Sequence, residues 1–186
     1  MKNFLITGGA GFVGSHLAAE LVSKGNKITI LDDLNTGKIN NLEKIKEKIN
    51  FIKGDIRDLD LLREICKDKD GVFHQAARAS VQESFEKPDE YHDVNVKGTE
   101  NVFTAAKEFG IKVVYASSSS VYGNPIELPI REESAKNPIN PYAQTKLDKE
   151  KLAIKFAKDG VKIIGLRYFN IFGKGQSKEY AGVIKL

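Results

Sequence analysis

Thr7-Gly8-Gly9-Ala10-Gly11-Phe12-Val13-Gly14 follows a short apolar run near the start of the chain, and this stretch decides the fold. Residues 4–6 have the length and composition of a buried strand, and a helical pattern begins at Gly11. The three glycines at positions 8, 11 and 14 therefore fall in a tight strand-to-helix turn. Backbone amides and the helix N-terminus can face a phosphate there with no Cβ in the way. Such turns also occur without a ligand, so the motif needs support from the rest of the chain.

The chain repeats this strand-then-helix pattern to its end. Further runs with the composition of strands cover residues 28–31, 50–52, 71–73, 113–116 and 161–166. Helical patterns cover residues 11–24, 58–67, 88–109 and 141–158. Six strands alternating with helices predict an α/β fold with a doubly wound parallel sheet, the Rossmann fold. We expect residues 1–170 to form this domain, with residues 171–186 beyond it.

Composition and charge limit the possible functions. The 186 residues suit one domain, with 41% hydrophobic and 29% charged residues. The net charge of +4 comes from mixed charges on helical stretches, so no nucleic-acid partner is expected. The single Cys66 lies in an amphipathic stretch and is expected to be packed and reduced, and no metal site is expected. The apolar run 4–6 is too short for a signal peptide or a membrane span, which indicates a cytoplasmic protein with no membrane partner.

An acidic pair ends the second predicted strand. Asp32 lies 18 residues after Gly14, where a carboxylate can accept hydrogen bonds from both ribose hydroxyls of a dinucleotide. An acid at this position repels a 2'-phosphate, so the pattern favours NAD over NADP. The alternative is that Asp32 and Asp33 merely begin a turn.

Later strand ends carry weaker signals. Asp55 could accept from the exocyclic amine of an adenine while Ile56 packs on its ring, although by itself the segment is an ordinary turn. Ala76 and Ala77 are small enough for close approach of a cofactor, or they pack a helix.

A tyrosine and a lysine lie one helical turn apart after Pro141, which suits a first helical turn. About one such Tyr-x-x-x-Lys match is expected by chance, so Tyr142 and Lys146 gain weight only from their position. They follow four consecutive serines, 117–120, that come directly after a predicted strand.

Taken together, these segments resemble the extended short-chain dehydrogenase/reductase family, and within it the NAD-dependent nucleotide-sugar epimerases similar to UDP-glucose 4-epimerase. The matching segments are residues 7–16, 32–37, 54–58, 74–81, Asn95, 117–123, 141–146 and 167–170. The resemblance implies NAD as cofactor, a nucleotide sugar as substrate and a homodimer. It places Val94, Val102, Leu147, Leu152 and Phe156 as apolar candidates for the interface between subunits.

The resemblance also assigns roles to individual residues. The catalytic residues are expected to be Ser118, Tyr142 and Lys146. The residues expected to bind the cofactor are Gly8, Gly11, Phe12, Val13, Gly14, Asp32, Asp33, Asn35, Thr36, Gly37, Asp55, Ile56, Gln75, Ala76, Ala77, Asn95, Tyr142, Lys146, Tyr168 and Phe169. The residues expected to bind substrate are Ser118, Ser119, Tyr142 and Asn170.

The reaction type follows from one position. Related sugar dehydratases carry an acid just before Val-Tyr-Gly, where this chain has Ser120, so epimerisation is favoured over elimination of water. A non-catalytic NAD-binding module, a dehydratase and another NAD-linked sugar oxidoreductase stay open as alternatives. Two departures from the family stand out: residues 173–176 read Gly-Lys-Gly-Gln where many relatives have Gly-Pro-Arg-Gln, and relatives continue into a C-terminal domain that encloses the substrate. Residues 171–186 are therefore interpreted as the start of a truncated substrate-binding portion.

Overall fold

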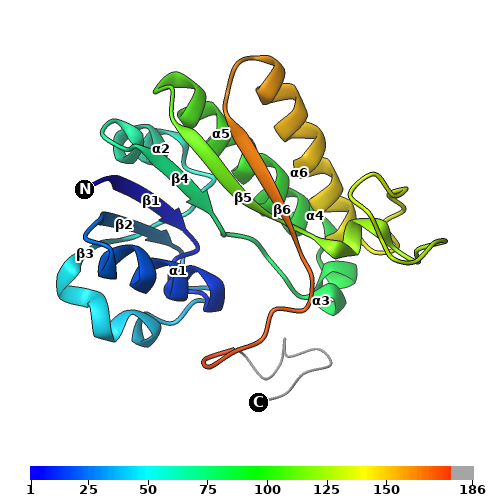
Figure 1. Cartoon of the computed structure of the whole chain (residues 1–186), viewed down its shortest axis with the longest axis horizontal. Helices are drawn as coiled ribbons and strands as arrows, with labels where there is room; N and C mark the ends of the chain where they lie inside the picture. Colours follow the sequence, from blue (N-terminus) through cyan, green and yellow to red (C-terminus); the bar gives the residue numbers. More distant parts are fainter. Residues whose placement is uncertain (177–186) are drawn as a thin grey trace.

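The sheet orders the whole molecule. A computed structural model describes residues 1–176. Over these residues six strands form one fully parallel sheet in the order β3-β2-β1-β4-β5-β6 (Figure 1). The strands are β1 (Asn3–Thr7), β2 (Lys27–Asp32), β3 (Ile49–Lys53), β4 (Gly71–His74), β5 (Lys112–Ser118) and β6 (Ile163–Tyr168). This is the doubly wound strand order of dinucleotide-binding folds, which confirms the predicted fold class.

Helices cover both faces of the sheet. One face packs on α1 (Phe12–Ser23) and on the 3-10 helix η1 (Ile39–Lys48), and the other packs on α2 (Leu59–Cys66), α5 (Gly98–Glu108) and α6 (Pro141–Lys158). Successive strand residues point to opposite faces, so Leu5 belongs to the core under α2, α5 and α6, whereas Ile6 belongs to the core under α1 and η1. Within residues 1–176, no helix combines the length and apolar character needed to cross a membrane.

The chain reverses its direction of winding between β1 and β4. From β1 it proceeds outward to β2 and β3, then crosses back to β4 on the other side of β1. Ligands of open α/β sheets bind at such a switch point, outside the carboxyl ends of the strands. Here the loops after β1, β2 and β4 meet at that point, because Gly8 N–H donates to Leu31 O (2.8 Å) and Gln75 N–H donates to Thr7 O (3.0 Å).

Four helical segments differ from the sequence-based prediction. The single helix predicted over 88–109 is α4 (Pro88–His92), the π-helical turn η2 (Asp93–Lys97) and α5 in succession. The π turn contains Asn95, which is fully buried, and such turns frequently occur at functional sites. Three short helices were not predicted: η1, α3 (Val81–Glu86) and η3 (Ser119–Tyr122). The last strand also starts two residues later than expected, at Ile163.

Candidate active site

The glycine loop leaves no room for side chains. Gly8 has φ of +69°, and a Cβ there would lie 2.6 Å from the amide nitrogen of Ala76. A Cβ on Gly14 would lie 2.2 Å from Gly8 O. Gly11 caps α1 without any side-chain hydrogen bond, and the first turn of the helix carries no acidic residue. The loop therefore presents backbone amides at a helix N-terminus, which suits a pyrophosphate.

Asp32 ties this loop to the end of β2. Its side chain is almost fully buried, and its two carboxylate oxygens accept from the N–H groups of Ala10 and Leu34, each at 2.9 Å. Burial raises the pKa of Asp32, and these two backbone hydrogen bonds oppose the rise. Leu34 has φ of +59°, a left-handed conformation that is costly for such a residue and that clusters at functional sites. A carboxylate keeps further lone pairs for ribose hydroxyls after accepting two hydrogen bonds.

A cavity at the switch point collects most of the residues predicted to bind the cofactor. It is lined by Gly8, Gly11, Leu31, Asp32, Asp33, Thr36, Gly37, Gly54, Asp55, Ile56, Gln75, Ala76, Ala77, Arg78 and Val94. Phe12, Val13 and Gly14 lie beside it in the first turn of α1, and Asn35 lies in the loop after β2. Segments far apart in the sequence thus converge on one site.

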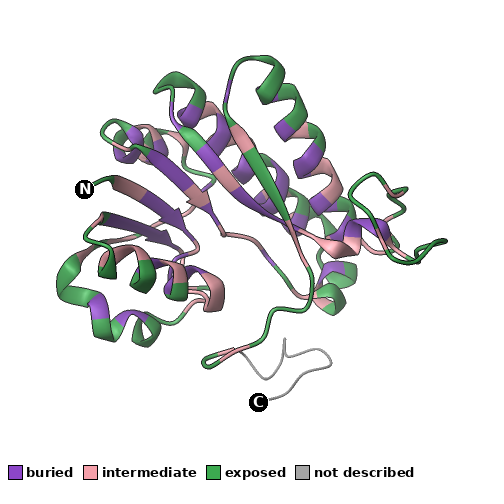
Figure 2. Ribbon diagram, viewed as in Figure 1, coloured by how far each residue is buried: buried purple, intermediate pink, exposed green. Residues whose placement is uncertain are grey.

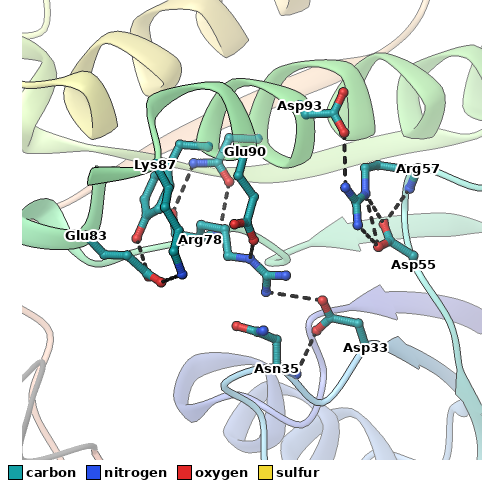
Figure 3. A network of polar contacts seen from close by, with 11 residues as sticks. Asp33, Asn35, Asp55, Arg57, Arg78, Glu83, Lys87, Glu90 and Asp93 are labelled. Atoms are coloured by element: carbon teal, nitrogen blue, oxygen red, sulfur yellow. Dashed lines mark hydrogen bonds and ion pairs between the residues drawn. The ribbon is translucent and has the colours of Figure 1, made fainter. Parts of the chain in front are cut away.

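Asp55 is held in this cavity by an arginine. The Nη2 of Arg57 lies 2.6 Å from one oxygen of Asp55, and its Nη1 lies 3.0 Å from Asp93 (Figure 3). The hydrogen bond from Arg57 lowers the pKa of Asp55, so this carboxylate stays ionised. An ionised carboxylate at this place accepts hydrogen bonds, as the predicted contact with an adenine amine requires.

Tyr142 and Lys146 lie in the first two turns of α6. Asn140 caps the helix by accepting from Ala143 N–H (2.8 Å), and Pro141 is the first residue of the helix. Lys146 is almost fully buried; its Nζ donates to Ala116 O (3.2 Å) and lies 5.4 Å from the centroid of the Tyr142 ring. The ammonium is thus fixed between the end of β5 and the tyrosine.

Ser118 ends β5 and faces the start of η3. Its Oγ accepts from the N–H of Ser120 (3.1 Å) and from the hydroxyl of Ser120 (2.9 Å). With both acceptor positions used, the proton of Ser118 is left to donate to another group. Ser119 follows in η3, which packs against α6.

Asn95 joins the start of α6 to the cofactor cavity. Its side-chain amide accepts from Arg78 N–H (2.8 Å) and donates to Arg78 O (3.0 Å). It also donates to Thr145 Oγ1 (3.0 Å), which in turn donates to Tyr142 O (2.7 Å). Asn95 thus links Arg78 of the cavity to the start of the helix that carries Tyr142 and Lys146.

Glu150 of α6 and Arg167 of β6 form an ion pair, and neither was assigned to the site from the sequence, although Arg167 lies in the matching segment 167–170. Glu150 accepts from Ser117 Oγ (2.6 Å) and forms a two-bond contact with Arg167, at 2.8 and 2.9 Å. Arg167 also donates to Tyr122 Oη (2.6 Å). Hydrogen bonds from Arg167 and Ser117 lower the pKa of Glu150 against the opposing effect of burial. The signal was present in the sequence, because Glu150 lies four residues after Lys146 on the same helix.

Lys149 is a fully buried lysine that the sequence reasoning also missed. Its Nζ lies 3.3 Å from Nε2 of the fully buried His74. Thr99 donates to Asn95 O (2.6 Å), so its oxygen accepts from His74 Nε2 (2.8 Å), and His74 Nδ1 accepts from Thr7 (2.7 Å). Lys149 therefore faces an N–H group, which favours its neutral amine. Burial lowers the pKa values of Lys149 and His74 well below their usual ranges.

The end of β6 connects the two sides of the site. Burial raises the pKa of Tyr168, and an interaction with Gln75, a residue of the cofactor cavity, opposes the rise. Phe169, predicted to contact the cofactor, is 60% exposed, and Asn170 is also exposed. Residues 177–186, part of the predicted segment 171–186, lie outside the described residues.

Four of the apolar interface candidates belong to the core instead. Val94, Val102 and Phe156 are buried in the cluster under α2, α5 and α6, and Leu152 packs against it. Cys66 is buried in the same cluster, and burial raises its pKa to about 11. Leu147 is not part of this cluster and remains a candidate, and the homodimer stays a prediction.

Together these features define a dinucleotide-binding domain of the short-chain dehydrogenase/reductase class. Three features identify this class: a crevice at the glycine loop, an acid at the end of β2, and a Tyr-x-x-x-Lys pair beside β5. The chain belongs to the NAD dependent epimerase/dehydratase family, which matches residues 4–186.

Similar proteins support this assignment. A UDP-glucose 4-epimerase of Lactobacillus helveticus is 43% identical over 91% of the chain and 52% of its own length. The structure of UDP-glucose 4-epimerase from Brucella ovis in complex with NAD is similar at a TM-score of 0.85 and 39% identity, covering 91% of this chain and 52% of that one. The structure of UDP-N-acetylglucosamine 4-epimerase from Methanobrevibacter ruminantium M1, in complex with UDP-N-acetylmuramic acid, is similar at a TM-score of 0.91 and 40% identity. The similarity covers 100% of this chain and 60% of that one.

The cofactor is therefore NAD, as predicted, and the crowded glycine loop fits its pyrophosphate. The chain spans little more than half the length of these relatives.

Proposed function

We propose that the protein serves the NAD-dependent epimerisation of a UDP-hexose or its N-acetyl counterpart at C4, through transient oxidation to a 4-keto sugar. The observation that carries the proposal is the buried Lys146 ammonium, fixed on Ala116 O beside the Tyr142 ring. NAD, when bound, supplies reversible acceptance of a hydride at its nicotinamide ring.

Tyr142 is the proposed base for the sugar hydroxyl. A free tyrosine titrates near pH 10, so a phenolate at neutral pH needs roughly 4 kcal/mol of preferential stabilisation of the anion. The Lys146 ammonium, whose Nζ lies 5.4 Å from the centroid of the Tyr142 ring, supplies part of this stabilisation. Ser118, whose proton is left free by its two contacts with Ser120, donates to the oxygen of the same sugar group. Asn95 keeps the start of the helix in register through Thr145.

Ser120 favours epimerisation over dehydration. Elimination of water needs an additional acid and base near the sugar. The position before Val121 carries a hydroxyl that is already bound to Ser118. We propose that residues 1–170 hold the cofactor and these catalytic groups, and that a substrate-binding portion begins at 171.

The test is a set of coupled assays with UDP-glucose and UDP-N-acetylglucosamine. We expect the 186-residue chain to bind NAD with little turnover, because the described residues leave the sugar side open and water must be excluded during the keto stage. In a form extended by the C-terminal portion of a relative, the C4 epimer should appear.

In that form Tyr142→Phe should abolish turnover while NAD binding persists, since the ring remains. Retained activity in Tyr142→Phe would refute the assigned base. Loss of water from the sugar, detected by mass spectrometry, would instead identify a dehydratase.

A further inference from the structure

Arg78 stands out because it introduces a positive charge into a cavity whose acids favour NAD. It follows β4, is almost fully buried, and lines the same cavity as Asp32 and Asp33. In NADP-binding relatives of this fold class, an arginine near the ribose accommodates the 2'-phosphate. The cavity thus contains an acid suited to NAD together with a cation suited to NADP.

Two carboxylates neutralise this cation. Arg78 Nη1 lies 3.2 Å from Asp33 Oδ2, and its Nε lies 3.2 Å from Glu90 Oε1 (Figure 3). Both polar atoms of the Asn95 side chain bind the backbone of Arg78, which fixes the main chain from which the guanidinium extends. Of the two carboxylates, Asp33 lines the cavity and Glu90 does not.

The ion pair with Asp33 also crosses the switch point. Asp33 follows β2 and Arg78 follows β4, and these strands lie on opposite sides of β1. Asp33 is adjacent to Asp32, the predicted partner of the ribose. The guanidinium therefore lies next to Asp33, at the end of the crevice where the ribose is expected to bind.

We propose that Asp33 is a specificity-determining residue that masks Arg78, and that Arg78 is a latent site for the 2'-phosphate of NADP. Asp33 engages the guanidinium and adds a negative charge beside the ribose, so a 2'-phosphate meets repulsion and no free donor. When that charge is removed, the guanidinium becomes available to a phosphate, the geometry that arginine recognises best.

The experiment compares the affinities of NAD and NADP by calorimetric titration of the chain freed of bound dinucleotide. Asp33→Asn keeps an oxygen that can accept from Asn35 N–H, a contact of 2.9 Å in the wild type, and removes the charge. We expect the Kd for NADP to fall at least about tenfold, both in absolute terms and relative to the Kd for NAD. In Asp33→Asn with Arg78→Met the gain for NADP should disappear. Asp33→Ser provides a second variant if Asp33→Asn folds poorly.

Glu108→Gln is the matched control, because it makes the same change in net charge at an exposed ion pair with Arg63. It should leave both affinities unchanged. An unchanged Kd for NADP in Asp33→Asn would overturn the proposal. So would an equal gain in the double variant, since the gain would then come from lost repulsion alone. Equal weakening of NAD and NADP by Arg78→Met would instead assign Arg78 to the pyrophosphate.

Discussion

The crevice between β1 and β4 and the outer edge at β6 are built in opposite ways. In the crevice each acidic group is already held: Asp32 by backbone amides, Asp33 by Arg78 and Asp55 by Arg57. At the edge, apolar side chains face outward, and Figure 2 shows β6 as a largely exposed strand. Ile164 and Phe169 are each 60% exposed, and Phe172 is 55% exposed.

This difference separates cofactor binding from turnover. A site whose polar groups are fixed before the ligand arrives loses little conformational entropy on binding. The crevice is therefore ready for NAD within the described residues. The proposed catalytic residues Tyr142, Lys146 and Ser118 lie on rigid elements, but β6, the strand next to β5, leaves apolar side chains exposed, as at sites that another part of a protein covers.

The largest effect is expected for Gly14→Ala, in the glycine loop of the crevice. The added Cβ would lie 2.2 Å from Gly8 O, a backbone atom that cannot yield without moving the loop. We expect the free energy of unfolding to fall by about 3 kcal/mol or more and the Kd for NAD to rise at least about 100-fold. Urea denaturation and calorimetric titration measure the two effects.

Gly25→Ala is the matched control. Gly25 has φ of +76°, but nothing lies within 4 Å of its added Cβ. The variant should lose only about 1 kcal/mol from backbone strain and keep its affinity for NAD. If Gly14→Ala behaves like Gly25→Ala, the loop is not the rigid cradle that the comparison requires.

The second test asks whether the buried pair Lys149 and His74 is uncharged. Burial lowers the pKa of Lys149 in the folded chain, whereas in the unfolded chain the lysine is charged below about pH 10.4. The unfolded state then binds more protons, so stability rises with pH from the lowered pKa up to about 10.4. Lys149→Met removes this dependence. The variant should be more stable than wild type at pH 7, by an amount that shrinks by up to about 1.4 kcal/mol per pH unit as pH rises.

Urea denaturation between pH 7 and about 9.5 measures this difference. The exposed Lys155 lies on the same helix, and Lys155→Met should show no such trend. A difference between wild type and Lys149→Met that stays constant with pH would mean that Lys149 remains charged beside His74.

The regular parts of the molecule could be predicted because their signals are local. Each strand is a short apolar run, Gly8 and Asp32 follow such runs at a characteristic spacing, and Tyr142 comes directly after Pro141 at a helix start. The π turn at Asn95 could not be predicted, because one extra residue in a helical turn leaves the apolar pattern nearly unchanged. The helix η1 was missed because it buries only Leu42 and Ile45 among many charged residues.

The roles of Arg78 and Lys149 needed the tertiary structure. In sequence, Lys149 resembles its exposed neighbours Lys151 and Lys155. One signal was present: Lys149 lies seven residues after Tyr142 and so on the same face of the helix. Arg78 finds its partners from two other segments, Asp33 and Glu90, which no local pattern brings together.

The smallest expected effect concerns β6, where two residues of one strand should behave differently. Ile164 is 60% exposed, so Ile164→Lys should change stability by less than about 0.5 kcal/mol and leave NAD affinity unchanged. Tyr168 interacts with Gln75, which lines the cofactor cavity, so Tyr168→Phe should weaken NAD binding by about threefold to tenfold. Calorimetric titration of both variants measures how far the crevice extends. Equal weakening of NAD binding by both variants would show that the whole of β6 supports the cofactor. The crevice and the edge at β6 would then form a single binding region.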